Sequence, residues 1–169
     1  TLLHGQSYPS KARVDASRIC ITGRSSGGLT VLCALIQYPD IFCAASSSYG
    51  ISDLKSLSQH THKYELHYTT TLMGGTYEDL PGVYKARSAL HHADKIRTPL
   101  LLLQGDQDRV VAPDQSRRMA RAIESHAGKI KYIEFPSEGH GFRRSDTRQR
   151  ALEEEFAWCN DAARIPEVC

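Results

Sequence analysis

Short apolar runs of two different periods alternate along the chain. Residues 19–22 form a brief β-branched run after a polar stretch, which predicts a strand. Residues 29–38 are apolar on most sides, and this run ends before Pro39 because the residue preceding a proline is pushed out of the helical conformation. The pattern therefore predicts a strand, a tight corner and a buried helix in succession.

Three later segments are also predicted to be strands. Residues 43–49 begin with small apolar side chains and stop at Gly50. Residues 98–104 are a continuous apolar run, which is typical of a strand covered on both faces. Residues 129–135 alternate between apolar and polar positions, as expected of a further strand. Between the second and third strands, residues 51–94 are polar and rich in breakers, so short helices and loops are expected there.

Two more helices are predicted among these strands. Pro113 suits the first position of a helix that ends at Gly128. In the last helix we predict Asp146 as the N-cap, with Gln149 three residues further on. The apolar stripe of this helix is predicted to consist of Leu152, Phe156, Cys159 and Ala163. The alternation of strands and helices favours an α/β fold in which helices flank a mostly parallel sheet.

Composition changes this picture little. The chain has 169 residues, of which 40% are hydrophobic and 24% are charged, as in one ordinary globular domain. The formal net charge is +2 and Lys and Arg are spread along the sequence, so nucleic acid is not an expected partner. No apolar run approaches the roughly 20 residues that span a bilayer, so no membrane partner is expected either.

Cysteine and histidine were considered as metal ligands. The cysteines are odd in number and form no CxxC pair: Cys20, Cys33, Cys43, Cys159 and Cys169. Reduced thiols are favoured, which suits a cytoplasmic location. Histidines occur in close pairs at His60 and His62 and at His91 and His92, but no carboxylate or thiol lies nearby at ligand spacing. We therefore expect no metal ion and no other cofactor.

Candidate chemistry lies at the corner between the first strand and the first helix. Residues 23–27, Gly-Arg-Ser-Ser-Gly, match the pattern GxSxG between a strand and a helix. In such an elbow the serine, here Ser25, has a strained backbone, and we expect the glycines at 23 and 27 to remove side chains that would collide. A serine before a helix is also a common N-cap, so capping is the alternative role.

A serine hydroxyl becomes a strong nucleophile only when a base removes its proton and an acid orients that base. Asp106 and Asp108 follow the strand predicted at 98–104, and His140 follows the strand predicted at 129–135. The carboxyl ends of parallel strands meet at one edge of a sheet, where sites of α/β proteins are built. Either aspartate could instead form a turn, and His140 could be an ordinary loop residue. The order Ser, Asp, His nevertheless predicts a hydrolase site.

On these residues the chain resembles the catalytic domain of the prolyl oligopeptidase family of serine peptidases, in its acylaminoacyl-peptidase or dipeptidyl-peptidase-like branch. The matching stretches are DASRICITGRSSGG, YGISDL, THKYE, SALHHADKI, TPLLLLQGDQDRVV and EGHGFRR. The resemblance implies the C-terminal part of an α/β-hydrolase fold. It implies Ser25 as nucleophile, Asp108 rather than Asp106 as the orienting acid and His140 as general base. It also implies an upstream β-propeller and hydrolysis of short peptides or blocked N-terminal residues.

Two features depart from the family pattern or are missing. Arg24 stands where relatives often have glycine, and the sequence does not fix its role. The backbone N–H of Ser26 is the expected oxyanion donor, but the second donor comes from an upstream loop for which the first 18 residues are too few. We therefore expect residues 1–169 to be part of a longer catalytic domain. Without its upstream neighbours, the first strand is expected to present an open edge through which copies of the chain could associate.

Three functions remain open on the sequence alone. A peptidase acting on short peptide substrates is the preferred one, with Arg109 either contacting a substrate carbonyl or forming a surface ion pair. A carboxylesterase or lipase would use the same three residues. A non-catalytic hydrolase-like domain would keep the fold without the chemistry.

Overall fold

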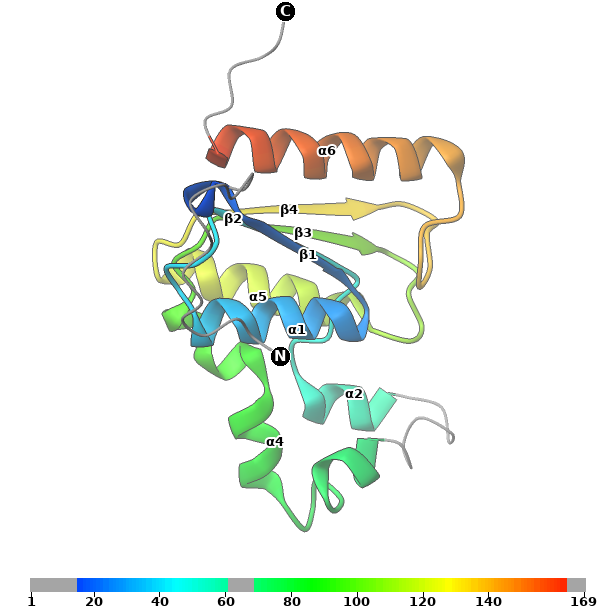
Figure 1. Cartoon of the computed structure of the whole chain (residues 1–169). Helices are drawn as coiled ribbons and strands as arrows, with labels where there is room; N and C mark the ends of the chain where they lie inside the picture. Colours follow the sequence, from blue (N-terminus) through cyan, green and yellow to red (C-terminus); the bar gives the residue numbers. More distant parts are fainter. Residues whose placement is uncertain (1–14, 61–68, 164–169) are drawn as a thin grey trace, which may run out of the picture.

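The computed structural model describes residues 15–60 and 69–163 of the chain (Figure 1). Four parallel strands form one sheet in the order β1-β2-β3-β4. Their bounds are Cys20–Arg24 for β1, Ala44–Ser48 for β2, Leu100–Gly105 for β3 and Ile130–Phe135 for β4. All four predicted strands are present, each starting or ending one or two residues from its predicted position. The matching stretch THKYE, with His62, and Cys169 lie outside the described residues.

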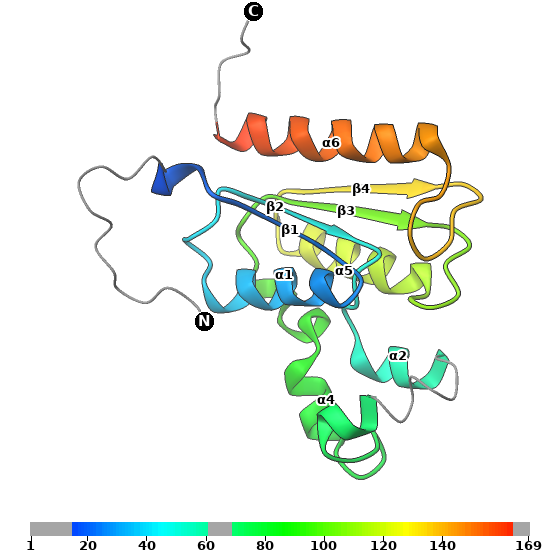
Figure 2. The same ribbon diagram turned by 45° about the vertical axis from the view of Figure 1, so that its right-hand side comes forward.

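Helices cover both faces of the sheet. Helices α1 (Ser26–Gln37) and α5 (Pro113–Ser125) lie on one face, and α6 (Ser145–Ala163) lies on the other (Figures 1 and 2). Helices α2 (Leu54–His60) and α4 (Pro81–Arg87) lie beyond the α1 and α5 layer, and there are two 3₁₀ helices, η1 (Ala16–Arg18) and η2 (Ala89–Lys95). This arrangement confirms the predicted α/β fold. No helix in residues 15–60 or 69–163 is both long and apolar enough to cross a bilayer.

The leucines of β3 contribute to two of the three hydrophobic clusters among the described residues. Leu100 and Leu102 pack in the core beneath α1 and α5, whereas Leu101 and Leu103 pack in the core beneath α6. Successive side chains of a strand point to opposite faces, so a strand in the middle of a three-layer structure needs apolar residues at every position. Every residue of β3 is buried, which accounts for the continuous apolar run.

Helix α6 differs from its prediction in two respects. It starts at Ser145, so Asp146 lies in its first turn and is not the N-cap. The predicted stripe is wrong for Leu152 and Phe156, which are 64% and 67% exposed, whereas Cys159 and Ala163 are partly buried. Instead the small side chain of Ala151 packs with Leu101 and Leu103. The helix thus turns Ala151 and Trp158 toward the sheet, and Leu152 and Phe156 remain at the surface.

Strand β1 lies at the edge of the sheet. It pairs with β2 on one side, and no strand among the described residues pairs with its other side. Its side chains alternate between partly buried and exposed positions except at its first two residues, which are both partly buried. The open edge predicted from the sequence is therefore present, and association of copies through this edge stays a prediction.

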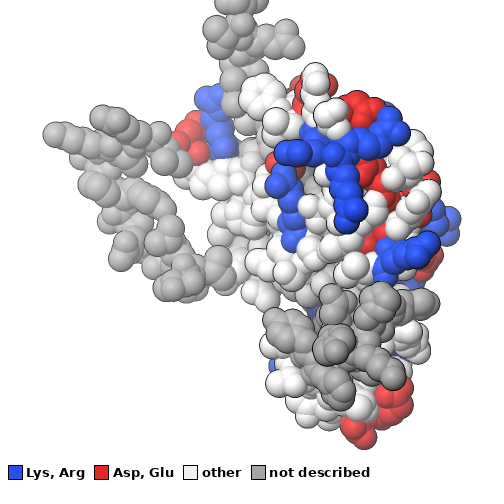
Figure 3. All heavy atoms as spheres, turned by 90° about the vertical axis from the view of Figure 1, so that its right-hand side faces the viewer, with Lys and Arg blue, Asp and Glu red and all other residues white. Residues whose placement is uncertain are grey.

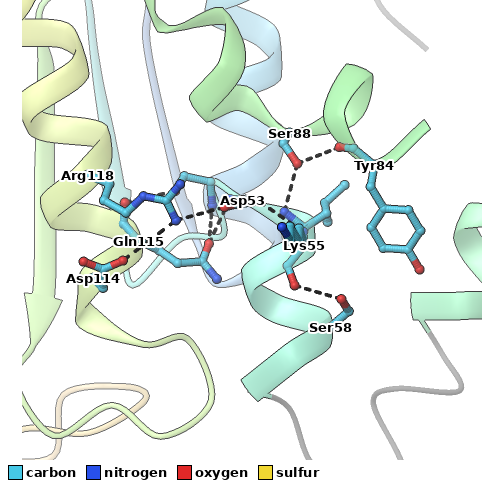
Figure 4. A network of polar contacts seen from close by, with 10 residues as sticks. Asp53, Lys55, Ser58, Tyr84, Ser88, Asp114, Gln115 and Arg118 are labelled. Atoms are coloured by element: carbon cyan, nitrogen blue, oxygen red, sulfur yellow. Dashed lines mark hydrogen bonds and ion pairs between the residues drawn. The ribbon is translucent and has the colours of Figure 1, made fainter. Parts of the chain in front are cut away.

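A buried polar network attaches the segment after β2 to α5 (Figure 4). The side-chain oxygen of Gln115 accepts hydrogen bonds from the backbone N–H groups of Ser52 and Asp53, at 2.8 and 2.9 Å. The Asp53 carboxylate in turn pairs with Arg118 at 2.9 Å. Ser88 donates to the Tyr84 carbonyl and accepts from the backbone of Leu54, which joins α4 to α2. Buried N–H groups need such partners, because an unsatisfied donor costs about 1–3 kcal/mol.

We predict that Gln115→Ala lowers the free energy of unfolding by about 2–4 kcal/mol, because two buried N–H groups lose their acceptor. Asp114→Ala on the same helix is the control, since Asp114 is exposed and its pair with Arg118 spans 3.8 Å. Its cost should stay within about 1 kcal/mol. Urea unfolding of both variants measures the difference. Equal losses of unfolding free energy would show that the hydrogen bonds accepted by Gln115 do not stabilise the fold more than an exposed residue does.

Candidate active site

Ser25 occupies a sharp turn between β1 and α1. Its backbone angles are φ 54° and ψ −122°, a left-handed conformation that a non-glycine residue rarely adopts. The turn is held by a hydrogen bond of 3.0 Å from the Ser25 N–H to the Ser48 carbonyl. Although Ser25 stands at the N-cap position of α1, its hydroxyl makes no capping bond. The hydroxyl is therefore free for another role.

The glycines around the elbow are not equally constrained. A Cβ at Gly23 would collide with the carbonyl of Gly27 and would lie 2.9 Å from a methyl group of Val31. A Cβ at Gly28 would lie 2.5 Å from the Ser47 hydroxyl. At Gly27 itself there is open space within 4 Å. The expectation that both glycines of the pattern prevent collisions is thus correct for Gly23 and wrong for Gly27, where Gly28 is the crowded residue.

The structure brings Ser25, His140 and Asp108 together. His140 Nε2 lies 2.9 Å from Ser25 Oγ, and His140 Nδ1 lies 2.9 Å from Asp108 Oδ2. These residues follow β1, β4 and β3, whose carboxyl ends lie at the same edge of the parallel sheet. The Asp108 side chain is fully buried, whereas that of His140 is 23% exposed. The hydroxyl, the imidazole and the carboxylate therefore form one hydrogen-bonded line from the surface inward.

The Asp108 carboxylate is held as an anion. Its Oδ1 accepts hydrogen bonds from the N–H groups of Val110 and Val111, both at 2.9 Å, and its Oδ2 accepts one from Gln104 at 3.1 Å. Burial alone would raise the pKa of this carboxyl, but the hydrogen bonds from His140, Val111 and Val110 outweigh burial and lower it. At neutral pH the group therefore stays charged and holds the Nδ1–H of His140.

Asp106 does not reach His140 and has a different function in the fold. It is exposed, and its Oδ1 accepts a hydrogen bond of 2.7 Å from the backbone N–H of Ser137. The neighbouring Gln107 N–H donates to the Glu138 carbonyl at 2.9 Å. These two bonds tie the loop that carries Asp108 to the loop that carries His140. His140 therefore contacts Asp108, the aspartate that the resemblance implies, whereas Asp106 bonds the backbone of Ser137.

Glu138 is a residue of the site that the sequence analysis missed. It is 1% exposed, and its two carboxylate oxygens accept the N–H groups of Arg143 and Arg144 at 2.8 and 3.1 Å. Burial would raise its pKa, yet the hydrogen bonds from Arg143, Arg144 and Thr147 lower it. The carboxylate thus fixes the turn that contains His140 to the start of α6. An acidic residue two positions before a candidate base and seven before a helix start was the available signal.

Tyr49 is a second missed residue. It directly follows β2 and has a positive φ of 40°. Its ring stands edge-on to the imidazole of His140, with centroids 5.0 Å apart, and edge-on to Phe142 at 5.2 Å. Such aromatic contacts limit how the imidazole can tilt. Nothing in the sequence placed Tyr49 beside His140, because the contact joins residues of different strands.

The expected oxyanion donor lies beside the hydroxyl in sequence. Ser26 is the first residue of α1, and the first N–H groups of a helix have no intrahelical acceptor. The helix dipole also favours negative charge at this end. Arg109 is exposed and forms no ion pair with a described residue, so neither of its two expected roles is decided.

Arg24 lines a hollow of about 510 Å³ between the sheet and the first turns of α6. Tyr49, Phe142, Arg148 and Glu155 contribute to the same wall. Figure 3 shows the face toward which the strands' carboxyl ends point, and Lys and Arg side chains gather in its upper half, near the start of α6. The side chain of Arg24 therefore belongs to a hollow with a basic rim.

Within residues 15–60 and 69–163, no three His, Cys, Asp or Glu side chains come together in a way that could hold a metal ion. The ring of His92 contacts the carbonyl of Ala86 at 3.1 Å.

Comparisons with known proteins identify relatives of the chain. A family model described as the prolyl oligopeptidase family matches residues 6–165. Dipeptidyl peptidase family member 6 of Caenorhabditis elegans is 31% identical over 140 residues, which cover 80% of this chain and 19% of that protein. Dipeptidyl aminopeptidase BIII of Pseudoxanthomonas mexicana is 32% identical over 136 residues, covering 78% of this chain and 20% of that protein.

A solved structure shows the same fold. The puromycin-hydrolyzing peptidase of Mycobacterium tuberculosis superimposes with a TM-score of 0.82 at 42% identity, over 88% of this chain and 22% of that one. This likeness and the helix-covered parallel sheet confirm the predicted α/β-hydrolase fold. The chain spans about a fifth of the length of the curated relatives it matches.

We predict that Glu138→Gln destabilises the protein by about 1–3 kcal/mol at pH 7, because an amide offers one acceptor where two N–H groups need one each. The pKa of Glu138 is lowered on folding, so its contribution is complete above about pH 4.5 and is lost as the pH falls further. The stability difference between wild type and variant should therefore shrink below pH 4.5.

Chemical denaturation at pH 7 and at pH 3.5 measures both values. Glu124→Gln, at an exposed position of α5, is the control and should leave stability unchanged at either pH. A Glu138→Gln difference that is the same at both pH values would contradict the assignment of a buried, charged carboxylate.

Proposed function

The chain belongs to the prolyl oligopeptidase family, and from this we propose that it carries the catalytic residues of a serine peptidase acting on short peptides. The observation that carries the proposal is the line of two hydrogen bonds of 2.9 Å from Asp108 through His140 to Ser25. A base that contacts the nucleophile and is itself held by a buried acid is the arrangement that activates a serine.

In the first step Ser25 Oγ attacks the substrate carbonyl carbon while His140 Nε2 accepts the hydroxyl proton. The imidazole then carries a positive charge, which the anionic Asp108 stabilises through Nδ1. The carbonyl oxygen becomes an oxyanion, and the free N–H of Ser26 at the start of α1 donates a hydrogen bond to it.

The tetrahedral intermediate collapses when His140 Nε2 gives its proton to the leaving amine. The C–N bond breaks and the acyl group remains bound to Ser25 Oγ. Water then enters, His140 removes one of its protons, and the resulting nucleophile attacks the acyl carbon. Collapse of the second intermediate returns the proton to Ser25 and releases the acid.

The names of the relatives suggest the substrate class. They include a dipeptidyl peptidase, an acylamino-acid-releasing enzyme and a puromycin-hydrolyzing peptidase. We extend this to the present chain as hydrolysis of short peptides or of blocked N-terminal residues. Ester hydrolysis is the competing activity, because the same three side chains attack either carbonyl. The free thiols of the described cysteines support a reducing, cytoplasmic location for this activity.

We predict that a fluorophosphonate probe labels Ser25 of this chain. The probe forms a covalent bond only with a serine whose proton is removed by a base, so the label should depend on His140. Ser25→Ala should abolish labelling, and His140→Ala should slow it at least about a hundredfold. Peptide mapping by mass spectrometry identifies the modified residue.

Ser26→Ala is the matched control for this experiment. It removes the adjacent hydroxyl but keeps the backbone N–H, so labelling should persist. An unlabelled wild-type chain that is correctly folded would favour the non-catalytic alternative, and label on Ser26 would refute Ser25 as the nucleophile.

We further predict that the protein hydrolyses amides and not only the more reactive esters of the same acyl group. Three chromogenic substrates separate the alternatives: a dipeptidyl 4-nitroanilide, an N-acetylated aminoacyl 4-nitroanilide and a 4-nitrophenyl ester. Asp108→Asn should lower kcat on either anilide by about 10³–10⁴-fold, because the imidazole loses its orienting charge. Turnover of the ester alone would replace the peptidase proposal by an esterase.

A further inference from the structure

A second group of reactive side chains lies at the end of the sheet opposite to Ser25. Cys20 is the first residue of β1, and Cys43 immediately precedes β2. Their sulfur atoms lie 3.6 Å apart. Cys159 of α6 is the third member, because its side chain interacts with that of Cys20 and raises the pKa of the Cys20 thiol. The first strands of the sheet begin on the side where α6 ends (Figure 1). The catalytic proposal uses none of these thiols.

The backbone at Cys20 and Cys43 has the geometry that a disulfide needs. Cys20 is paired in register with Ala44, and the Cys43 N–H donates to the Ile19 carbonyl at 2.9 Å. The two cysteines are thus offset by one residue on neighbouring strands. A strand spacing of ~4.8 Å and a rise of ~3.3 Å place their Cα atoms about 5.8 Å apart. Disulfides form at Cα separations of roughly 4.4–6.8 Å, so this spacing permits a bond, for which the sulfur atoms, now 3.6 Å apart, must approach to about 2.05 Å.

Both sulfur atoms belong to partly exposed residues. Cys20 and Cys43 are each of intermediate exposure, so a small solute can approach them. Cys33 of α1 differs from them, because only burial raises the pKa of its thiol and no neighbouring thiol contributes to the shift. The pair is therefore distinguished from Cys33 by its proximity, and from Cys159 by its position at the start of two neighbouring strands.

We propose that Cys20 and Cys43 form a dithiol site that a low-molecular-weight disulfide such as oxidised glutathione converts reversibly to an intramolecular disulfide. In the first exchange, the thiolate of one cysteine attacks a glutathione sulfur and releases one glutathione thiolate. In the second, the other cysteine attacks the mixed disulfide and releases the second. Two protein thiols are oxidised and one oxidised glutathione is reduced to two glutathiones, which take up the two protons.

The position of the bond gives it a structural effect. The ring that it closes runs from Cys20 to Cys43 and contains β1, the elbow with Ser25 and the whole of α1. Strand β1 is an edge strand that β2 alone holds among the described strands. A covalent link at its first residue prevents β1 from separating from β2 at that end. The oxidised protein should therefore resist unfolding more strongly than the reduced one.

The experiment incubates the chain in glutathione buffers of increasing oxidised fraction and maps its peptides without reduction. We expect a Cys20–Cys43 link, a mass lower by two hydrogen atoms, full reversal by dithiothreitol and a Tm raised by about 5–10 °C. Cys43→Ser should lose both the link and the Tm increase. Cys33→Ser is the matched control and should keep both.

Three results would overturn the proposal: a link between Cys20 and Cys159, glutathione mixed disulfides at Cys20 and Cys43 without a link between them, or no oxidation of either thiol in a fully oxidised buffer. The readouts are mass and melting temperature, so they do not depend on the peptidase activity proposed for Ser25.

The pH dependence of the rate gives a further check. Burial and the neighbouring thiols of Cys159 and Cys20 raise the pKa values of Cys20 and Cys43 above the ordinary value of 9.0. Because the thiolate is the attacking form, the rate of linking should increase about tenfold for each pH unit between pH 7 and 9. A rate that levels off below pH 8 would show that the thiol pKa values are low, which would contradict the raised pKa values expected from burial and from the neighbouring thiols.

Discussion

The hydrogen bond between His140 and Asp108 is the interaction on which the rest of the site depends. It is 2.9 Å long and ends on a carboxylate whose side chain is completely buried. A buried charge is stable only when its hydrogen-bonding capacity is used, and here Val110, Val111 and Gln104 use it together with His140. The carboxylate is therefore held in place by three groups other than His140, and this fixed carboxylate orients the imidazole.

The two loops that carry these residues are fixed to each other by contacts outside the hydrogen-bonded line. Asp106 and Gln107 bond the backbone of residues 137 and 138, and a Cβ at Gly105 would collide with the Glu138 carbonyl. Glu138 then holds the far side of the turn against the start of α6. The position of His140 relative to Asp108 is thus determined by backbone contacts, and reactive geometry of this kind tolerates little misplacement.

Much of this arrangement could be predicted from the sequence. The features that could not be predicted each have an identifiable physical reason. The strands, α1 and the order Ser25, Asp108, His140 follow from local patterns and from the rule that carboxyl ends of parallel strands share an edge. The stripe of α6 could not be predicted, because the residue that meets the sheet is the small Ala151 and hydrophobicity alone favours Leu152 and Phe156. Tyr49 acts through a contact between residues of different strands, which no local pattern encodes, and the spacing of Glu138 from His140 and the start of α6 is the one local signal for its role. The proximity of Cys20 and Cys43 depends on strand register, which the sequence also leaves undetermined.

Backbone strain concentrates where the chemistry is proposed. Of the four non-glycine residues with positive φ among those described, Ser25, Tyr49 and Ser137 follow β1, β2 and β4 at their carboxyl ends. Each such conformation costs on the order of 1–3 kcal/mol and persists only when its surroundings determine it. At Ser25 the bond to Ser48 supplies part of that support, so the elbow relies on the pairing of β1 with β2. Because β1 is one of the two edge strands of the described sheet, the strain at the proposed nucleophile lies at the end of a strand that only β2 pairs with. The strained conformation of Ser25 therefore depends on the pairing of β1 with β2 over the whole strand. Contacts at Cys20, the first residue of β1, thus help to hold the turn that follows its last residue, Arg24.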